Sequence, residues 1–108
     1  MSTKILQVNF KFNVTGEEYT QAVTPLADPI AAVPGLRWKV WIINEEQSEA
    51  GGILHFDDGD SLNSYLNGDI AAGIVNHPAL SDFSVKTFDV MEEQTAVTRG
   101  PVKQVAAA

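Results

Sequence analysis

Three polar side chains of this sequence are candidates for proton-transfer chemistry: His55, Lys39 and Asn9. His55 can accept a proton near neutral pH, Lys39 can stabilise an anion through its positive charge, and Asn9 can orient an oxygen atom by hydrogen bonding. Arg37 and Lys86 are alternative cations for the same task. Together, these groups are suited to removing a proton from an acidic O–H or C–H bond and stabilising the anion that results.

Aromatic side chains near these polar groups favour a flat, apolar ligand. Trp38 and Trp41 flank Lys39 in the sequence and can stack on an aromatic ring. The predicted ligand-binding residues are Trp38, Trp41, Tyr65, Phe10 and Phe56. Each candidate also has a structural interpretation, because tryptophan often serves as core or as an interface anchor. Likewise, a single histidine on a strand is usually structural.

The composition excludes several classes of site. Among 108 residues there is no cysteine, and seven Lys and Arg stand against fourteen Asp and Glu, which gives a net charge of −7. The lack of cysteine excludes thiolate chemistry, and the acidity argues against nucleic-acid or anionic-membrane partners. The two histidines lack spaced carboxylates, so no metal is expected. With no leader sequence and no long apolar stretch, a cytoplasmic location is expected.

The pattern of apolar residues predicts an α+β fold. Alternation predicts strands over residues 5–13, 36–44, 49–57 and 82–91, and helical spacing begins at Thr15 and after Asp57. Pro25 and Gly68 are expected to interrupt the two helical regions. The resulting order is the ferredoxin-like βαββαβ motif, a four-stranded antiparallel sheet with both helical segments on one face. Residues 1–91 form the predicted single domain, and residues 92–108 form a tail that could dock on a partner subunit.

Strict alternation along the strands divides the candidate residues between the two faces of the sheet. Phe10, Phe56 and Trp38 fall on the face that the helices cover, as does Tyr65 from its helix. The candidates on the opposite face are Asn9, Lys39, Trp41 and His55. Because this second face mixes apolar and basic side chains, it is predicted to pack against a second copy in a homodimer.

The two groups of candidates cannot line one cavity unless the register of a strand is irregular. The Gly51-Gly52 pair is the predicted place for a bulge or for a close approach to the backbone. A pocket between sheet and helices is favoured, because the interruptions at Pro25 and Gly68 loosen both helices there.

Several motifs of this chain resemble the YdhR-like putative monooxygenase family. They are Pro34-Gly35-Leu36-Arg37-Trp38-Lys39-Val40-Trp41, Glu49-Ala50-Gly51-Gly52-Ile53, Tyr65-Leu66 and Lys86-Thr87-Phe88-Asp89-Val90. The resemblance extends over residues 1–91. It implies the dimeric α+β barrel fold, which is similar to that of the antibiotic biosynthesis monooxygenases. Those enzymes oxygenate aromatic polyketide-like substrates without flavin, haem or metal.

The resemblance therefore implies a cofactor-independent monooxygenase, an oxidoreductase that uses O₂ on a flat aromatic or polyketide-like small molecule. No cofactor is expected. The chemistry requires a dry aromatic pocket, a proton acceptor and groups that stabilise the substrate anion. Two alternatives share the same fold: a non-catalytic small-molecule-binding or stress-response module, and a cofactor-free isomerase.

Overall fold

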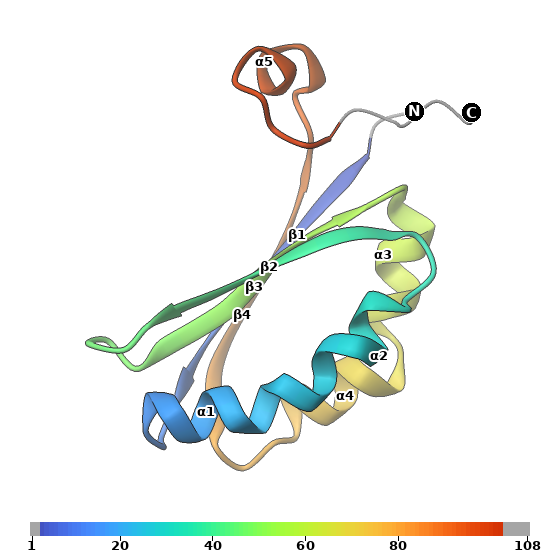
Figure 1. Cartoon of the computed structure of the whole chain (residues 1–108). Helices are drawn as coiled ribbons and strands as arrows, with labels where there is room; N and C mark the ends of the chain where they lie inside the picture. The colour runs from blue at the N-terminus through green and yellow to red at the C-terminus, as the bar shows by residue number, and fades with distance from the viewer. Residues whose placement is uncertain (1–2, 103–108) are drawn as a thin grey trace.

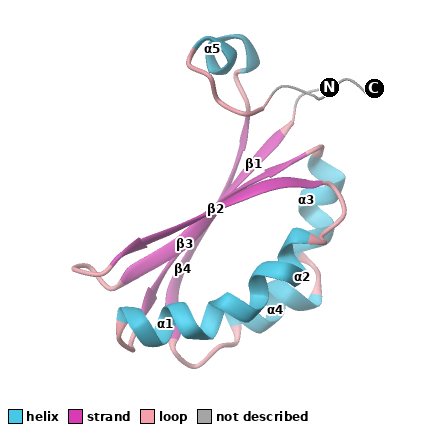
Figure 2. Ribbon diagram, viewed as in Figure 1, coloured by secondary structure: helices cyan, strands magenta, loops and turns pink. Residues whose placement is uncertain are grey.

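The computed structural model describes residues 3–102 and contains one sheet with helices against one face (Figure 1). In chain order the elements are β1 (Lys4–Phe12), α1 (Gly16–Val23), the 3-10 turn η1 (Thr24–Leu26), α2 (Ala27–Ala31), β2 (Leu36–Asn44), β3 (Glu49–Phe56), α3 (Gly59–Leu66), α4 (Asp69–Val75), β4 (Leu80–Asp89) and α5 (Glu92–Val97). The sheet order is β2-β3-β1-β4, with every pair antiparallel. Helices α1 to α4 lie on the same side of it (Figure 2). This confirms the predicted ferredoxin-like α+β fold.

The helices begin and end where local sequence signals place them. Thr15 caps α1 in a capping box: its hydroxyl accepts from the backbone N–H of Glu18, and the Glu18 carboxylate accepts from the N–H of Thr15, both at 3.1 Å. Pro25 lies in the 3-10 turn that separates α1 from α2. Gly68 separates α3 from α4 as the N-cap of the second helix. Both predicted interruptions are confirmed.

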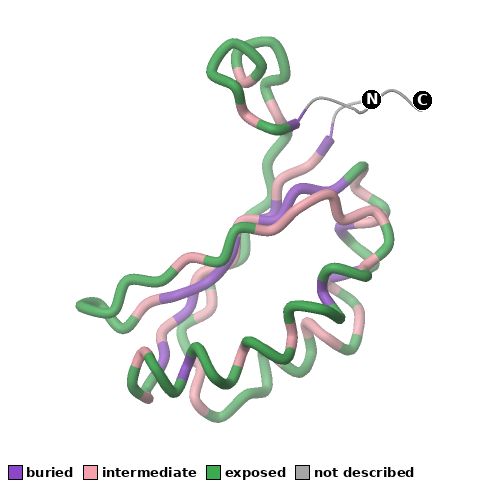
Figure 3. The backbone as a smooth tube through the Cα atoms, in the orientation of Figure 1, coloured by how far each residue is buried: buried purple, intermediate pink, exposed green. Residues whose placement is uncertain are grey.

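Two groups of buried side chains hold the helices against the sheet. The first contains Leu6, Leu54, Phe56, Leu62 and Tyr65, and the second contains Phe10, Phe12, Tyr19 and Ala50. Figure 3 shows that the longest buried stretch of chain follows the sheet, while most helix residues are exposed. Each large apolar side chain in these groups contributes roughly 1.5–3 kcal/mol through burial.

A bulge in β2 changes the alternation of that strand. Leu36 lies opposite Phe56 on β3, but the next partner pair joins Trp38 to His55. Two steps along β2 therefore match one step along β3, which leaves Arg37 as the extra residue. Because the side-chain period of a strand is two, this single insertion moves every later side chain of β2 to the other face.

The bulge corrects three of the face assignments made from the sequence. Lys39 lies opposite Leu54 and Trp41 lies opposite Gly52, on the face that the helices cover. Trp38 lies on the opposite face. The predicted sheet faces of Trp38, Lys39 and Trp41 are thus wrong, because strict alternation takes no account of the additional residue.

The Gly51-Gly52 pair is a place of close approach rather than of irregular register. Pairing with both neighbouring strands is continuous through these two residues. A Cβ atom on Gly51 would lie 1.8 Å from the carbonyl oxygen of Val8, and one on Gly52 would lie 2.5 Å from Cε of Lys39. The first glycine lets two strands approach, and the second leaves room for a lysine side chain.

The segment after β4 contains a short helix that the sequence pattern did not predict. Figure 1 shows α5 beyond one end of the sheet. After α5 the chain returns to β2, where the Trp38 indole donates to the carbonyl of Pro101 at 2.8 Å and Arg37 donates to that of Val102 at 3.3 Å. Docking of the tail on a partner, and the domain limit at residue 91, remain predictions; residues 103–108 lie outside the described part of the chain.

No helix among residues 3–102 combines the length and apolar character needed to cross a membrane.

Candidate active site

An enclosed hollow of about 30 Å³ lies between the sheet and the helices, and we call it the chamber. Its walls include Phe10, Tyr19, Lys39, Trp41, Leu54 and Tyr65. β1, β2 and β3 supply the sheet side, and α1 and α3 supply the two tyrosines. A space of this size holds a water molecule or two, so a flat ligand would enter only if a side chain of the wall moved.

Two open grooves share walls with the chamber. One groove, of about 280 Å³, lies between α1 and β2 and has Val23 and Trp41 in common with the chamber. The other, of about 260 Å³, lies between α1 and α4 and has Tyr19, Val23, Leu26 and Ile74 in common with the chamber. The shared side chains thus separate the chamber from spaces of about 260 Å³ and 280 Å³.

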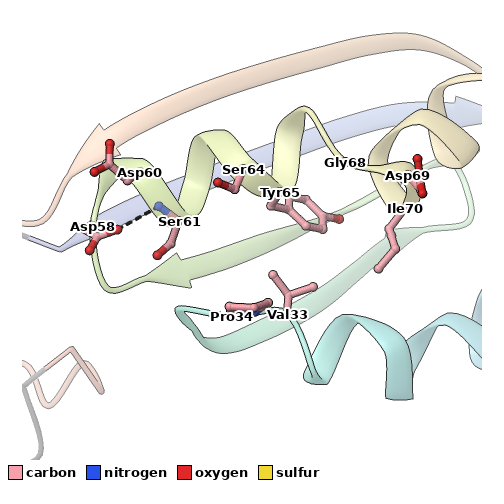
Figure 4. A pocket seen from close by; sticks show the side chains of 10 residues that line it. All are labelled: Val33, Pro34, Asp58, Asp60, Ser61, Ser64, Tyr65, Gly68, Asp69 and Ile70. Atoms are coloured by element: carbon pink, nitrogen blue, oxygen red, sulfur yellow. Dashed lines mark hydrogen bonds between the residues drawn. The ribbon is translucent and has the colours of Figure 1, made fainter.

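A third opening lies between the turn that joins α2 to β2 and the helices α3 and α4, and it has a volume of about 430 Å³ (Figure 4). Tyr65 lines both this pocket and the chamber. Asp58 at its edge accepts a hydrogen bond from the backbone N–H of Ser61 at 2.8 Å and caps α3. This hydrogen bond holds the pKa of the Asp58 carboxyl below its usual value. With Asp60 and Asp69 also present, the pocket edge is negative and disfavours anionic ligands.

Lys39 is the group in the chamber best suited to proton transfer. Its Nζ atom lies 3.5 Å from the centroid of the Trp41 ring, a cation–π contact. Within residues 3–102 the ion pairs involve other cations, and Lys39 has neither a salt bridge nor a side-chain hydrogen bond. Burial lowers the pKa of Lys39 from 10.5 to about 8. A substantial fraction of this amine is therefore neutral in mildly alkaline solution and able to accept a proton.

The two tyrosines of the chamber stay protonated under the same conditions. Burial raises the pKa of Tyr19 and of Tyr65 above 10.0, because the phenolate loses its hydration. Each therefore offers a neutral hydroxyl beside an aromatic wall. Phe10 lies 6.0 Å from Tyr19 between ring centroids, and Phe56 lies 5.7 Å from Tyr65. The chamber thus combines one titratable amine with aromatic surfaces and hydroxyl groups.

His55 lies outside the chamber, on the opposite face of the sheet. Its side chain is fully buried, with Nε2 2.8 Å from the hydroxyl of Thr3 and its ring 5.1 Å from that of Trp38. Burial first, and then the positive charge of Arg37, hold the pKa of His55 below 6.5. Asn9 is also on this face and accepts a hydrogen bond from Gln7 at 3.1 Å.

The structure therefore brings together only part of the set chosen from the sequence. Phe10, Lys39, Trp41 and Tyr65 share the chamber. His55, Asn9 and Trp38 lie on the other face, and Phe56 belongs to the core beside Tyr65. Tyr19 and Gly52 are chamber residues that the sequence analysis did not select. Tyr19 shares a helical apolar stripe with Ala22 and Val23, a pattern that could have indicated it. The role of Gly52 depends on the bulge at Arg37, near the start of β2, which turns Lys39 and Trp41 toward the helices.

We expect Gly52→Ala to raise the pKa of Lys39 from about 8 toward 10.5. The new Cβ atom would lie 2.5 Å from Cε of Lys39, and the flexible lysine would move away from it toward water. Titration of ¹³C-labelled lysine by NMR measures this change. The matched control is Gly73→Ala, because nothing lies within 4 Å of a Cβ atom there. The control should leave the pKa of Lys39 unchanged and stabilise α4 by about 0.5–1 kcal/mol. An unchanged pKa of Lys39 in Gly52→Ala would contradict the role assigned to Gly52, which is to leave room for the lysine side chain.

Comparison with known proteins gives one family and a set of similar folds. Residues 5–101 match the family described as "Putative mono-oxygenase ydhR". No curated protein matches this chain. A protein of unknown function from Nitrosomonas europaea is 23% identical, with a TM-score of 0.67, over 84% of this chain and 91% of that one. SnoaB from Streptomyces nogalater, a cofactor-independent oxygenase solved as its N63A mutant, is 15% identical, with a TM-score of 0.69. That alignment covers 84% of this chain and 95% of SnoaB.

A third solved structure is a dimeric ferredoxin-like protein of unknown function from Thermobifida fusca. It is 21% identical, with a TM-score of 0.63, and the alignment covers 83% of this chain and 93% of that one. At such identities these likenesses establish the fold, and function has to be argued from the site.

Proposed function

This chain belongs to the ydhR family of putative mono-oxygenases, and from that premise we propose that it oxygenates a flat aromatic or polyketide-like molecule with O₂ in the chamber. The observation that carries the proposal is the half-buried amine of Lys39, which lies among aromatic walls and has no ion-pair partner within residues 3–102. Oxygenation without a cofactor requires a substrate anion that can itself give electrons to O₂. A proton acceptor in a dry aromatic site supplies that anion.

The proposed reaction begins with proton transfer from the substrate to Lys39. A phenol or enol lies against Trp41, and its proton moves to the neutral amine. The ammonium that forms stays beside the substrate anion, which it stabilises in a site of low dielectric. The hydroxyl of Tyr65 donates a hydrogen bond to the same oxygen. The anion then reacts with O₂, so that an activated CH₂ group and O₂ become a carbonyl group and water.

We also propose that the protein acts as a homodimer through the face of the sheet opposite the helices. Val40 and Phe88 on this face are 50% and 47% exposed, and Ile5 and Ile53 are partly exposed. Exposed apolar side chains on adjacent strands favour a partner surface. The similar fold from Thermobifida fusca is described as dimeric. Sedimentation analysis should give a dimer at micromolar concentration, and a stable monomer would contradict this assembly.

Oxygen uptake with a panel of anthrone-like and quinol substrates tests the proposed activity. We expect O₂ consumption that depends on enzyme, with one atom of ¹⁸O₂ in the product. Tight ligand binding with neither O₂ uptake nor a product would identify a binding module instead. Isomerisation of the ligand without O₂ uptake would identify an isomerase.

A further inference from the structure

The amine of Lys39 differs from every other described lysine in its surroundings. Lys4 pairs with Asp89, and Lys11 lies 3.8 Å from Glu49. Lys86 is exposed on the opposite face of the sheet. Lys4 and Lys39 both lie on the face of the sheet that the helices cover, but Lys39 is the one described lysine that lines the chamber. There Gly52 leaves room for its methylene groups, and the Trp41 ring lies against its nitrogen.

We propose that Lys39 is a carbonyl-reactive amine, which captures aromatic aldehydes or ketones as a Schiff base within the chamber. The reaction needs a neutral nitrogen with a free electron pair, a carbonyl carbon within reach and a site that excludes competing water. No acidic side chain within residues 3–102 pairs with this nitrogen, which leaves it free to react, and the aromatic walls select flat carbonyl compounds. This activity needs no O₂ and therefore stands apart from the oxygenation proposed above.

The chemistry balances without any further reactant. The Lys39 nitrogen adds to the carbonyl carbon, and a carbon–nitrogen bond forms while the oxygen takes up a proton. The carbinolamine then loses that oxygen with two protons as water, which leaves a C=N bond between lysine and ligand. Burial favours the first step, the addition of nitrogen to the carbonyl carbon, because a lysine whose pKa is about 8 is more often neutral than an exposed one.

Reductive labelling under nitrogen tests the proposal. The full-length protein is incubated at pH 8 with 2-naphthaldehyde and cyanoborohydride, which reduces the imine to a stable secondary amine. Peptide mapping then gives the labelling rate at each lysine and separates Lys39 from the N-terminal amine, whose ordinary pKa is also near 8. We expect Lys39 to react at least tenfold faster than any other lysine, because at pH 8 about half of an amine with a pKa of about 8 is neutral, against less than about 1% of an amine with the ordinary pKa of 10.5.

Three controls make the outcome decisive. In 8 M urea, the preference for Lys39 should disappear. Lys39→Arg should lose the fast label, while Lys86→Arg keeps it. Trp41→Leu should reduce the preference for naphthaldehyde over propanal, because the stacking surface is removed. Equal rates at all lysines of the folded protein would overturn the proposal. Fast labelling without O₂ uptake on the substrate panel would support this inference while contradicting the oxygenase.

Discussion

Oxygen uptake by Lys39→Met is expected to fall by about 100-fold or more in kcat/KM, the usual contribution of a positioned acid or base. Methionine keeps the length and apolar stem of lysine, so it fills the same space over Gly52 and leaves the chamber walls in place. What it removes is the nitrogen that accepts the substrate proton. Steady-state oxygen consumption on a substrate that the wild type turns over measures the change.

The pH dependence separates a base from a simple positive charge. A base acts in its neutral form, so kcat/KM of the wild type should rise as the pH increases through about 8, the pKa of Lys39. A residue that only stabilised an anion would act as the ammonium, and the rate would fall over the same range. Lys39→Arg adds a second test, because arginine keeps the charge but does not deprotonate. We expect this variant to be as inactive as Lys39→Met.

Lys11→Met is the matched control for both variants. Lys11 is partly exposed at the far end of β1, and its contact with Glu49 is a surface ion pair worth at most about 1 kcal/mol. Lys11 does not line the chamber, and surface substitutions of this kind change stability little. Its replacement should therefore leave kcat/KM within about twofold of the wild-type value. Full activity in Lys39→Arg would assign Lys39 the anion-stabilising role and exclude it as the base.

Much of the fold could be predicted from the sequence because its determinants are local. The capping box at Thr15 needs only a residue three positions away, and Pro25 interrupts a helix wherever it falls in one. β1 alternates cleanly, so one face of it had to be core. The order of elements then left the ferredoxin-like arrangement as the simplest solution.

The composition of the site could not be predicted in the same way, because it depends on the bulge at Arg37. β2 is apolar on both faces, with Val40 and Ile42 on one side and Trp41 on the other. Burial of either face is therefore plausible, and the hydrophobic pattern does not fix the register. At the bulge, the side chains of Arg37 and Trp38 donate hydrogen bonds to the backbone carbonyls of Val102 and Pro101. These partners lie more than 60 residues away in the sequence.

The buried His55 should affect stability much more than catalysis. We expect His55→Ala to lower the free energy of unfolding by about 2–4 kcal/mol, because it opens a cavity in a fully buried position. It also leaves the hydroxyl of Thr3 without its partner. Denaturant unfolding followed by circular dichroism measures this change at one fixed protein concentration. His77→Ala is the control, because His77 is exposed and should cost about 1 kcal/mol or less.

Acid should weaken the wild type through the same residue. Burial, together with the charge of Arg37, keeps the pKa of His55 below 6.5, and the opposing effect of Asp57 and Glu92 is smaller. Below about pH 6.5, His55 therefore binds a proton in the unfolded chain more readily than in the folded chain. As a result, the free energy of unfolding falls as the pH drops. His55→Leu does not titrate, so it should lose this part of the pH dependence, whereas His77→Ala should retain it. An identical slope in His55→Leu and the wild type would show that another group is responsible.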